Sequence, residues 1–354
     1  MAEAVKSPKD SAGGGEIKTV YMDVSNELAL GIDIGGTNTK YGVVNHRGEI
    51  LQKGDLRTDE YDTVDDFLDA LYKTLNPVIS KFNKANIQGI GIGAPNGNFY
   101  SGTIEYAPNL KWKGIIPLAK MISARFGLQA GLTNDANAAA VGEMMYGAAR
   151  GMKDFIMITL GTGVGSGIVA NGHLILGHDG FAGELGHTIV VPGGRLHKGT
   201  GMHGSLEVYA SATGVAETAK EMLEQFPKEK SLMRDYPAKK INSKIVHECA
   251  LKNDPIAKKV YEFTGKILGE ALANYVMFSS PEAIILFGGL TKAGDMIMKP
   301  TVVNMEKNLL PIFQNKVKLV FSELKESDAA ILGASALVWE MKATAERSAA
   351  HYTE

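Results

Sequence analysis

The sequence predicts an α/β protein made of two similar halves, and three observations support this prediction. Glycine supplies 41 of the 354 residues and gathers in turns between short apolar runs. A pattern of strand, glycine turn, strand, turn and strand occurs twice, beginning at Leu28 and again at Phe155. Segments with helical periodicity follow each pattern. A chain of this length is sufficient for about two domains.

The two patterns share their order and nearly their spacing. In both, an apolar run leads into a glycine turn, and a second glycine closes a polar turn before the third strand. The paired segments are Leu28–Asp33 with Phe155–Leu160, Gly35 with Gly161, Gly48 with Gly172, and Glu49–Lys53 with His173–Leu176. Any glycine-rich hairpin resembles part of such a unit, but three strands and two turns in the same order favour a duplication.

The helical segments carry start signals. Thr63–Asp66 resembles a capping box, and the apolar residues after it recur near helical spacing as far as Phe82. Pro77 lies inside this segment and should kink or split the helix. Further predicted elements are a strand at Gln88–Ile92, a helix at Asn137–Tyr146, a helix behind Asp254 and Pro255, a buried strand at Glu282–Phe287 and a last helix capped by Ser327.

The predicted domain boundaries follow from these elements. Residues 1–27 lack an apolar signal core and include three consecutive glycines, so we expect a flexible tail. Residues 28–134, together with a C-terminal helix at 328–354, would form a small α/β domain. Residues 135–327 would form a large one, and two such domains leave a cleft between them.

Composition and charge exclude several classes of protein. The chain carries 37 basic and 39 acidic residues, whereas a non-specific nucleic-acid binder or a membrane-surface protein needs a basic excess, so we expect neither partner. No apolar run approaches the roughly 20 residues that cross a bilayer. The single cysteine, Cys249, excludes a disulfide framework and suits a reducing compartment, so we expect a cytoplasmic protein.

The two glycine turns favour a phosphate site. Glycine permits a positive φ and lets the backbone approach an anion, so that N–H groups point at phosphate oxygens. Neither turn is a Walker A loop or a Rossmann fingerprint, because the required spacing is absent and a strand follows each turn. One turn alone would more often be a structural hairpin. Two, with Asp33 beside the first and Thr162 within the second, favour a nucleotide held from both sides.

Two further motifs offer groups for chemistry on a hydroxyl. Asn134 and Asp135 occupy a strand-to-helix junction, where a carboxylate can accept a proton, although both residue types are common N-caps. Glu184 and His187 lie three residues apart between glycines, and such a pair can bind vicinal hydroxyls of a sugar. The alternatives for this pair are a metal site or a surface turn. The flanking glycines make a helix unlikely, which weakens the metal alternative.

The segment Asp33–Lys40 (DIGGTNTK) resembles the first phosphate motif of the actin/hexokinase/Hsp70-like ATPase fold, and more narrowly that of the ROK sugar kinases. Leu160–Gly167 is similar to the second phosphate loop of that family, and Ile285–Leu290 to its adenosine-side Gly-Gly motif. The resemblance covers nearly the whole chain. It implies two duplicated ribonuclease-H-like domains with an active-site cleft, ATP and Mg²⁺ as cofactors, a hexose substrate and a homodimer.

The resemblance also implies a role for each site residue. Asp135 falls on the position of the catalytic aspartate, and Asp33 would organise the magnesium shell. Sugar contacts would come from Asn109, Asn134, Glu184, His187 and Glu207. Phosphates would lie against Gly35, Gly36, Thr37, Lys40, Thr162 and Gly163, and the adenosine against Gly288 and Gly289. Trp112 is expected to pack in a core or lid.

One loop departs from the family pattern. Many ROK proteins have a CxCGxxGC run that holds a structural zinc together with the histidine at the position of His187. The cysteine positions fall here on Lys198, Thr200 and Ser205. Tetrahedral zinc with thiolates cannot form without thiols, so we expect no structural zinc. A substitute set of His187, His197 and His203 is conceivable, but loop histidines are more often solvated.

Together these expectations describe an ATP-dependent hexose kinase acting on the 6-hydroxyl, with glucose as the expected substrate. An N-acetylhexosamine kinase, for N-acetylmannosamine or N-acetylglucosamine, fits the same motifs. A sugar-responsive repressor of the family would need a helix-turn-helix of roughly 60 residues before the first phosphate loop, and 27 residues precede Leu28. An actin-like assembly protein would leave Glu184, His187 and Glu207 without a role.

Overall fold

The computed structural model describes residues 4–5, 20–21 and 26–351, and only the backbone of residues 4–5, 20–21 and 344–351. Most of the tail expected at 1–27 lies outside the described residues, so its flexibility stays a prediction. Within it, β1 (Ala4–Val5) pairs antiparallel with β2 (Val20–Tyr21).

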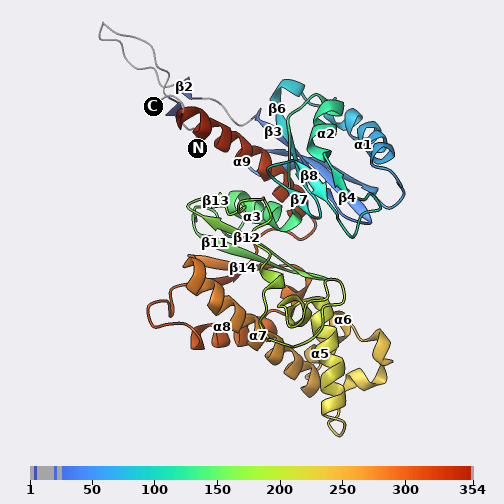
Figure 1. The fold of residues 1–354 in the computed structure, drawn as a ribbon, viewed down its shortest axis with the longest axis vertical. Helices are drawn as coiled ribbons and strands as arrows, with labels where there is room; N and C mark the ends of the chain where they lie inside the picture. The colour runs from blue at the N-terminus through green and yellow to red at the C-terminus, as the bar shows by residue number, and fades with distance from the viewer. Residues whose placement is uncertain (1–3, 6–19, 22–25, 352–354) are drawn as a thin grey trace.

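Two five-stranded sheets lie within the described residues, one in each half of the elongated molecule (Figure 1). The first has the order β10-β6-β3-β4-β5. Its strands are β3 (Leu28–Ile34), β4 (Asn38–Asn45), β5 (Ile50–Arg57), β6 (Ile87–Gly93) and β10 (Ala130–Thr133). The first three strands are antiparallel neighbours, while β6 and β10 run parallel to β3.

The second sheet repeats this topology with the order β13-β12-β11-β14-β15. Its strands are β11 (Phe155–Leu160), β12 (Val164–Ala170), β13 (His173–Leu174), β14 (Ala283–Phe287) and β15 (Lys318–Phe321). Again three antiparallel strands are followed by two parallel ones. The duplication predicted from the glycine turns is therefore confirmed.

Helices cover the faces of both sheets. The α-helices are α1 (Val64–Ile79), α2 (Leu118–Phe126), α3 (Asp135–Tyr146), α4 (Glu207–Ala210), α5 (Ala212–Gln225), α6 (Ser243–Leu251), α7 (Pro255–Ser279), α8 (Asp295–Lys307) and α9 (Ala329–His351). Short 3-10 helices are η2 (Lys84–Asn86), η3 (Leu185–His187), η4 (Leu232–Asp235), η5 (Ala238–Lys240) and η6 (Gly289–Ala293). A small sheet contains β7 (Gly97–Asn98), β8 (Thr103–Glu105) and β9 (Ile115–Ile116).

Most helix starts follow the predicted signals, and two details differ. Thr63 caps α1 as predicted, but the helix continues through Pro77 and ends two residues later, because a proline in the last turn removes only one of the final hydrogen bonds. The last helix begins at Ala329, and the Ser327 hydroxyl bonds the Asp328 carboxylate (3.1 Å). Asp254 caps α7 as predicted, accepting from the Ala257 N–H.

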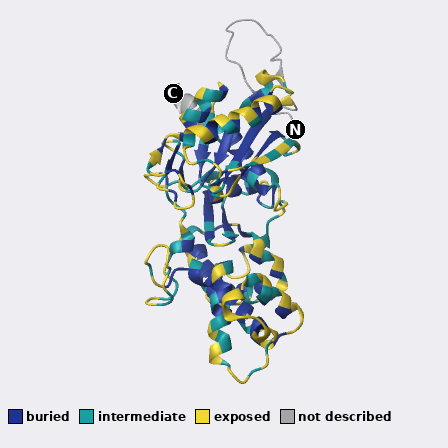
Figure 2. Ribbon diagram, turned by 90° about the vertical axis from the view of Figure 1, so that its right-hand side faces the viewer, coloured by how far each residue is buried: buried dark blue, intermediate teal, exposed yellow. Residues whose placement is uncertain are grey.

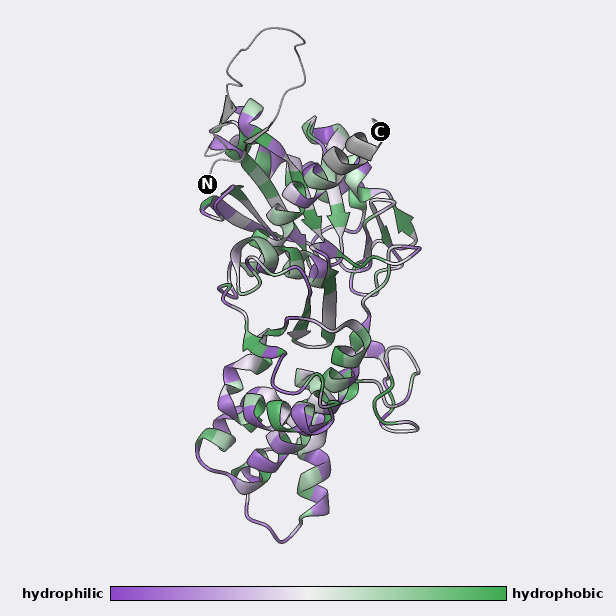
Figure 3. Cartoon of the chain, turned by 90° about the vertical axis from the view of Figure 1, so that its left-hand side faces the viewer, coloured by the Kyte–Doolittle hydropathy of each residue, from purple (hydrophilic) through white to green (hydrophobic). Residues whose placement is uncertain are grey.

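Each half has its own hydrophobic core. One cluster draws its buried residues from between Leu28 and Leu132 and the other from between Ile156 and Val317. The central strands β3, β6, β11, β12 and β14 are largely buried (Figure 2). Hydrophobic residues lie along these strands (Figure 3). Trp112 lies in the first core, its ring 4.7 Å from that of Phe67, as predicted.

Two helices join the halves. Helix α3 packs on β12 of the second sheet. Helix α9, which follows the second sheet in the sequence, packs on β3 and β6 of the first. A Cβ at Gly31 or Gly91 would collide with carbonyl oxygens of α9, so the helix lies directly on the sheet backbone. Helices α3 and α9 also touch each other, because a Cβ at Gly142 would lie 2.9 Å from the Gly333 Cα.

A second contact between the halves lies between β7–β8 and the loop after β13. The Asn98 amide donates to the Asp179 carbonyl oxygen (2.7 Å), and the Tyr100 hydroxyl donates to that of Gly177 (3.0 Å). No helix within the described residues is long and apolar enough to span a membrane.

The substitution Gly91→Ala should destabilise the fold. Its methyl group would meet the Ala334 carbonyl oxygen, and overpacking of this kind costs about 1–3 kcal/mol. Gly161→Ala is the matched control, because a methyl group there meets no atom within 4 Å. Chemical denaturation of both variants measures the difference. Equal stability of the two would contradict the packing of α9 on β6.

Candidate active site

Both glycine turns are three-residue connections between antiparallel strands. The first joins β3 to β4, and the Gly35 N–H donates to the Asn38 carbonyl oxygen (3.0 Å). The second joins β11 to β12, and the Gly161 N–H donates to the carbonyl oxygen of Gly163 (3.0 Å). The turns therefore occupy equivalent positions in the two sheets.

The glycines in these turns are needed for close approach. No glycine of either turn has a positive φ, so the left-handed conformation suggested by their sequence is not used. Instead, a Cβ at Gly36 would collide with the Asn109 carbonyl oxygen, and one at Gly163 would collide with the Glu207 carboxylate. The turns thus bring Asn109 and Glu207, both predicted sugar ligands, against the predicted phosphate loops.

Asp33 and Asp135 lie close together. A Cβ placed on Gly93, the β6 residue paired with Asp33, would be 3.5 Å from the Asp33 Oδ1 atom and 3.9 Å from the Asp135 Cα. The pKa of Asp33 is raised to about 6, mainly by burial and in part by the charge of Asp135, while Lys40 lowers it. Burial also raises the pKa of Asp135, against two backbone hydrogen bonds. Both carboxylates hold protons more tightly than usual.

Asn134, and not Asp135, caps helix α3. The Asn134 Oδ1 atom accepts from the Asn137 N–H (2.7 Å), which leaves its amide NH₂ as the group able to bind a hydroxyl. The Asp135 Oδ1 atom accepts from the Ala136 N–H (2.9 Å), and the residue keeps solvent-exposed surface although neighbouring atoms desolvate its carboxyl group. Asp135 therefore has an accessible carboxylate in the first turn of α3.

Glu184 precedes a short helical turn, and His187 is the last residue of that turn. Residues 185–187 form η3, so the prediction that the glycines make a helix unlikely is wrong for this single 3-10 turn, which contains Gly186. The His187 Nε2 atom lies 3.9 Å from Glu184 Oε2. Burial raises the pKa of Glu184, His187 lowers it, and the charges of Asp135 and Glu207 raise it further.

Side chains from β12 and α7 hold this turn in place. The Ser166 hydroxyl donates to the Gly183 carbonyl oxygen and accepts from the Leu185 N–H (3.0 Å). The Tyr275 hydroxyl donates to the Leu185 carbonyl oxygen (2.9 Å) and contacts the Thr188 hydroxyl (2.5 Å). Burial raises the pKa of Tyr275 to about 12, so its hydroxyl keeps the proton that it donates.

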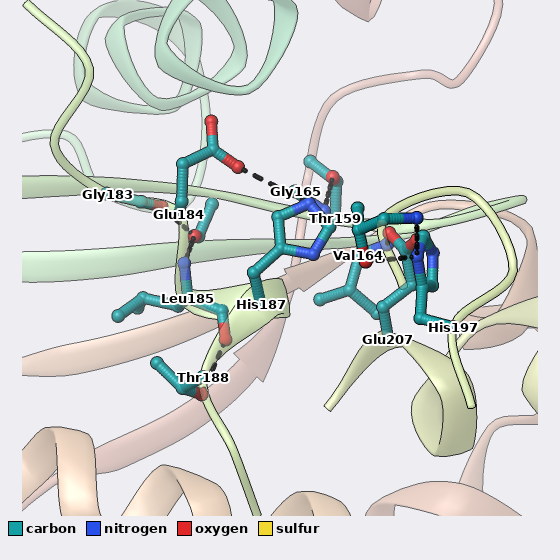
Figure 4. A network of polar contacts seen from close by, with 12 residues as sticks. Thr159, Val164, Gly165, Gly183, Glu184, Leu185, His187, Thr188, His197 and Glu207 are labelled. Atoms are coloured by element: carbon teal, nitrogen blue, oxygen red, sulfur yellow. Dashed lines mark hydrogen bonds and ion pairs between the residues drawn. The ribbon is translucent and has the colours of Figure 1, made fainter. Parts of the chain in front are cut away.

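Glu207 and His197 form a hydrogen-bonded pair beside His187. Figure 4 shows His187 between Glu184 on one side and Glu207 with His197 on the other. The Glu207 Oε1 atom lies 2.6 Å from His197 Nε2, and Oε2 accepts from the Val164 N–H (2.7 Å). Glu207 therefore links the second glycine turn to the loop that carries His197.

Arg195 fixes the position of the loop at 193–205. Its guanidinium donates to both Glu221 carboxylate oxygens (3.0 and 2.6 Å) and to the Thr218 hydroxyl (3.1 Å) on α5. It also donates to two backbone carbonyl oxygens and lies 4.7 Å from the centre of the Tyr209 ring. The role of Arg195 was not predicted from the sequence. An isolated arginine in a polar loop gives no indication that its partners lie on α5.

The residues at the family's zinc positions do not fit that metal. Lys198 and Thr200 are exposed, and Ser205 is buried with no partner for its hydroxyl. The His203 Nδ1 atom lies 3.0 Å from the Gly194 carbonyl oxygen. Among the described residues, no group of three histidine, cysteine, aspartate or glutamate side chains is arranged to hold a metal.

The remaining predicted residues surround the two turns. Thr37, Lys40 and Thr162 are exposed. Gly288 follows β14 with φ +105°, and a Cβ there would lie 2.7 Å from the Leu160 carbonyl oxygen at the end of β11. Gly289 is the exposed first residue of η6. The Gly-Gly motif therefore lies beside the second turn, on the β14 side of the sheet.

Comparison with known proteins assigns the family. The model of the ROK family matches residues 29–341. The chain belongs to the ROK family. A glucokinase of Halalkalibacterium halodurans is 36% identical over 330 residues, which cover 92% of this chain and 98% of the relative. A xylose repressor of Caldicellulosiruptor bescii is 27% identical over 91% of this chain and 81% of its own.

Solved ROK structures share the fold. A ROK glucokinase from Streptomyces griseus, in complex with glucose and AMPPNP, superposes with a TM-score of 0.72 at 32% identity, covering 88% of this chain and 98% of its own. The chain therefore has the duplicated actin-like ATPase fold of ROK sugar kinases. The family contains both kinases and transcriptional repressors.

The substitution Asp33→Asn should increase stability above pH 6. A raised carboxyl pKa means that the folded state binds the proton more tightly, so wild-type stability falls as the pH rises from 3.8 to about 6. The asparagine variant lacks this loss. Its advantage should grow across that window to on the order of 2–3 kcal/mol, given 1.36 kcal/mol per pKa unit. Chemical denaturation of both proteins at pH 4 to 8 measures the difference in their free energy of unfolding. A difference that does not change with pH would contradict the raised pKa of Asp33.

Removal of divalent metals should not affect the loop at 193–205. We expect purified, untagged protein to contain no stoichiometric zinc and to keep its melting temperature after EDTA treatment, because hydrogen bonds of Arg195 and His197 hold the loop. Elemental analysis and thermal melting test this. Zinc that EDTA removes with loss of fold would refute it.

Proposed function

We propose that this chain is an ATP-dependent hexose kinase that transfers a phosphoryl group to the 6-hydroxyl, with glucose as the preferred sugar. The observation that supports it most is the accessible, desolvated Asp135 carboxylate beside Asp33 and Glu184. The identity of 36% to one glucokinase, against 27% to a xylose repressor, also favours the kinase over the regulator.

Asp135 would act as the general base. Phosphoryl transfer to an alcohol needs alignment and a carboxylate that receives the hydroxyl proton. A base works best when its pKa approaches the working pH, and burial raises the pKa of Asp135 in that direction. Because Asn134 caps α3, the Asp135 carboxylate is left available for the substrate.

The residues present fit a magnesium–nucleotide complex. Mg²⁺ in proteins is held by one or two carboxylates together with phosphate oxygens, and the Asp33 carboxylate at the end of β3 offers such a donor. When bound, the ion neutralises charge on the transferred phosphoryl group. The N–H groups of the two glycine turns, with Thr37, Lys40 and Thr162, would bind the phosphates, and Gly288 and Gly289 would lie against the adenosine.

The hexose would bind between the turns and η3. The Glu184 carboxylate and the His187 ring would bind neighbouring hydroxyls, with Asn134 contributing its free NH₂ group. Glu207 would accept from a hydroxyl through lone pairs not used by His197 and Val164, and Asn109 would bind from the first turn. Burial is the main cause of the raised pKa of Glu184, and the charges of Asp135 and Glu207 add to it; hydroxyl donors of a bound sugar would stabilise the charged carboxylate.

The two halves would close over the substrates. We propose that residues 28–134 with 328–354 form one domain and residues 135–327 the other, joined where α3 crosses α9. Closure would exclude water from the phosphoryl group. We also propose that the protein is cytoplasmic and forms a homodimer.

A coupled ADP-release assay tests the activity and the sugar together. Glucose, mannose, fructose, N-acetylglucosamine and N-acetylmannosamine are compared at equal concentration, with a no-sugar control. Highest kcat/KM with glucose is the expected result. Preference for an N-acetylhexosamine would move the proposal to the alternative kinase. ADP release independent of sugar, or none with any sugar, would overturn it.

The substitution Asp135→Asn should lower kcat by about 10²–10⁴, because the amide keeps the shape of the side chain but cannot take the proton. The hexose KM should change far less. Glu184→Gln is the matched comparison and should raise the hexose KM at least as much as it lowers kcat, since its contact exists before the transition state. Steady-state kinetics measures both. If the asparagine variant kept more than about a tenth of kcat, Asp135 would not be the base.

A further inference from the structure

We propose that His197 is a positioning residue that orients Glu207 for the hexose, and that it does so in the loop where other ROK proteins hold zinc. The inference rests on the proposed function, because it deepens the sugar site. Both side chains are mostly buried, with 18% and 19% of their surfaces exposed. Their contact of 2.6 Å therefore lies largely out of solvent, where a hydrogen bond to a charged group is strong.

The backbone of the loop fixes which nitrogen of His197 carries the proton. The Thr200 N–H donates to His197 Nδ1 (3.0 Å), so that nitrogen is an acceptor. In the neutral ring the proton must then be on Nε2, the atom that faces Glu207. His197 therefore donates to the Glu207 carboxylate, and the loop backbone sets this direction.

Glu207 is consequently held at both oxygens. His197 binds Oε1, and the Val164 N–H, directly after the second glycine turn, binds Oε2. A carboxylate with both oxygens held cannot rotate freely, while each oxygen keeps a lone pair for a sugar hydroxyl. Without His197, Glu207 would keep one fixed oxygen and could turn about that bond.

The neighbourhood of His197 offers contacts that could hold this loop in place of a metal. The rings of His197 and His187 meet edge to face with centres 5.6 Å apart, so His197 lies beside the histidine that the family uses for zinc. The His187 Nδ1 atom and the Ser205 hydroxyl, at two of the family's zinc positions, are buried without a hydrogen-bond partner. Arg195, two residues before His197, ties the loop to α5.

Two nearly isosteric substitutions separate the proposed role from a purely structural one. His197→Gln can place an amide NH₂ near the position of Nε2 and so keep the donor to Glu207, but it loses the acceptor for Thr200. His197→Asn keeps an acceptor near Nδ1 for the Thr200 N–H, but cannot reach Glu207. His203→Ala is the control, because that ring lies in the same loop and contacts only the Gly194 carbonyl oxygen among the hydrogen bonds described.

Steady-state kinetics and thermal melting are measured for wild type and the three variants, with the hexose that the sugar panel identifies. We expect His197→Asn to raise the hexose KM by about tenfold or more, with kcat and the KM for ATP within about threefold. His197→Gln should stay within about threefold of wild type in all three, as should His203→Ala.

The outcomes separate the inference from the proposed function. A normal hexose KM in His197→Asn, or a larger defect in His197→Gln than in His197→Asn, would overturn the positioning role while wild-type activity leaves the kinase proposal intact. A fall in kcat alone would also overturn it, because the contact acts on sugar binding. Absence of sugar-dependent activity in the wild type would overturn both.

Discussion

The site depends on backbone segments that approach one another where no side chain intervenes. Gly36 admits the Asn109 backbone, Gly163 admits the Glu207 carboxylate, and a Cβ at Gly186 would collide with the Val164 carbonyl oxygen. Each contact joins a glycine turn, or the strand after it, to a segment that is distant in sequence. A single methyl group would force these segments apart, so the lack of a side chain at Gly36, Gly163 and Gly186 sets how closely the two turns approach Asn109 and Glu207.

Crowded carboxylates give this arrangement its electrostatic character. Asp33, Asp135 and Glu184 all have raised pKa values, chiefly from burial, and Asp135 contributes to the shift of both others. The free protein therefore carries unrelieved negative charge at one place. A metal–nucleotide complex and hydroxyl donors would each stabilise the charged carboxylates, and so would offset part of the cost of their burial and mutual repulsion.

Features encoded locally could be predicted from the sequence, and features made by distant contacts could not. The duplicated turns, the Asp254 cap and the strand at 283–287 depend on neighbours within a few residues, and each was predicted correctly. The 3-10 turn at Leu185–His187 depends on Ser166 and Tyr275, which are remote in sequence, and the start of α9 depends on packing against the first sheet. For the same reason the role of Arg195, whose partners lie on α5, could not be predicted from its neighbours in the sequence. The roles expected for the site residues were inferred from the resemblance to the ROK family.

The position of α9 along the chain constrains how the protein is made. Strands β3 and β6 leave the ribosome long before α9, whose carbonyl groups lie against Gly31 and Gly91. Until α9 emerges, one apolar face of the first sheet has no cover, whereas the second sheet and its helices are complete by Phe321. The second half can therefore complete its core before the first half does, although it is synthesised later. Until α9 is available, the first sheet exposes an apolar face that a chaperone can bind.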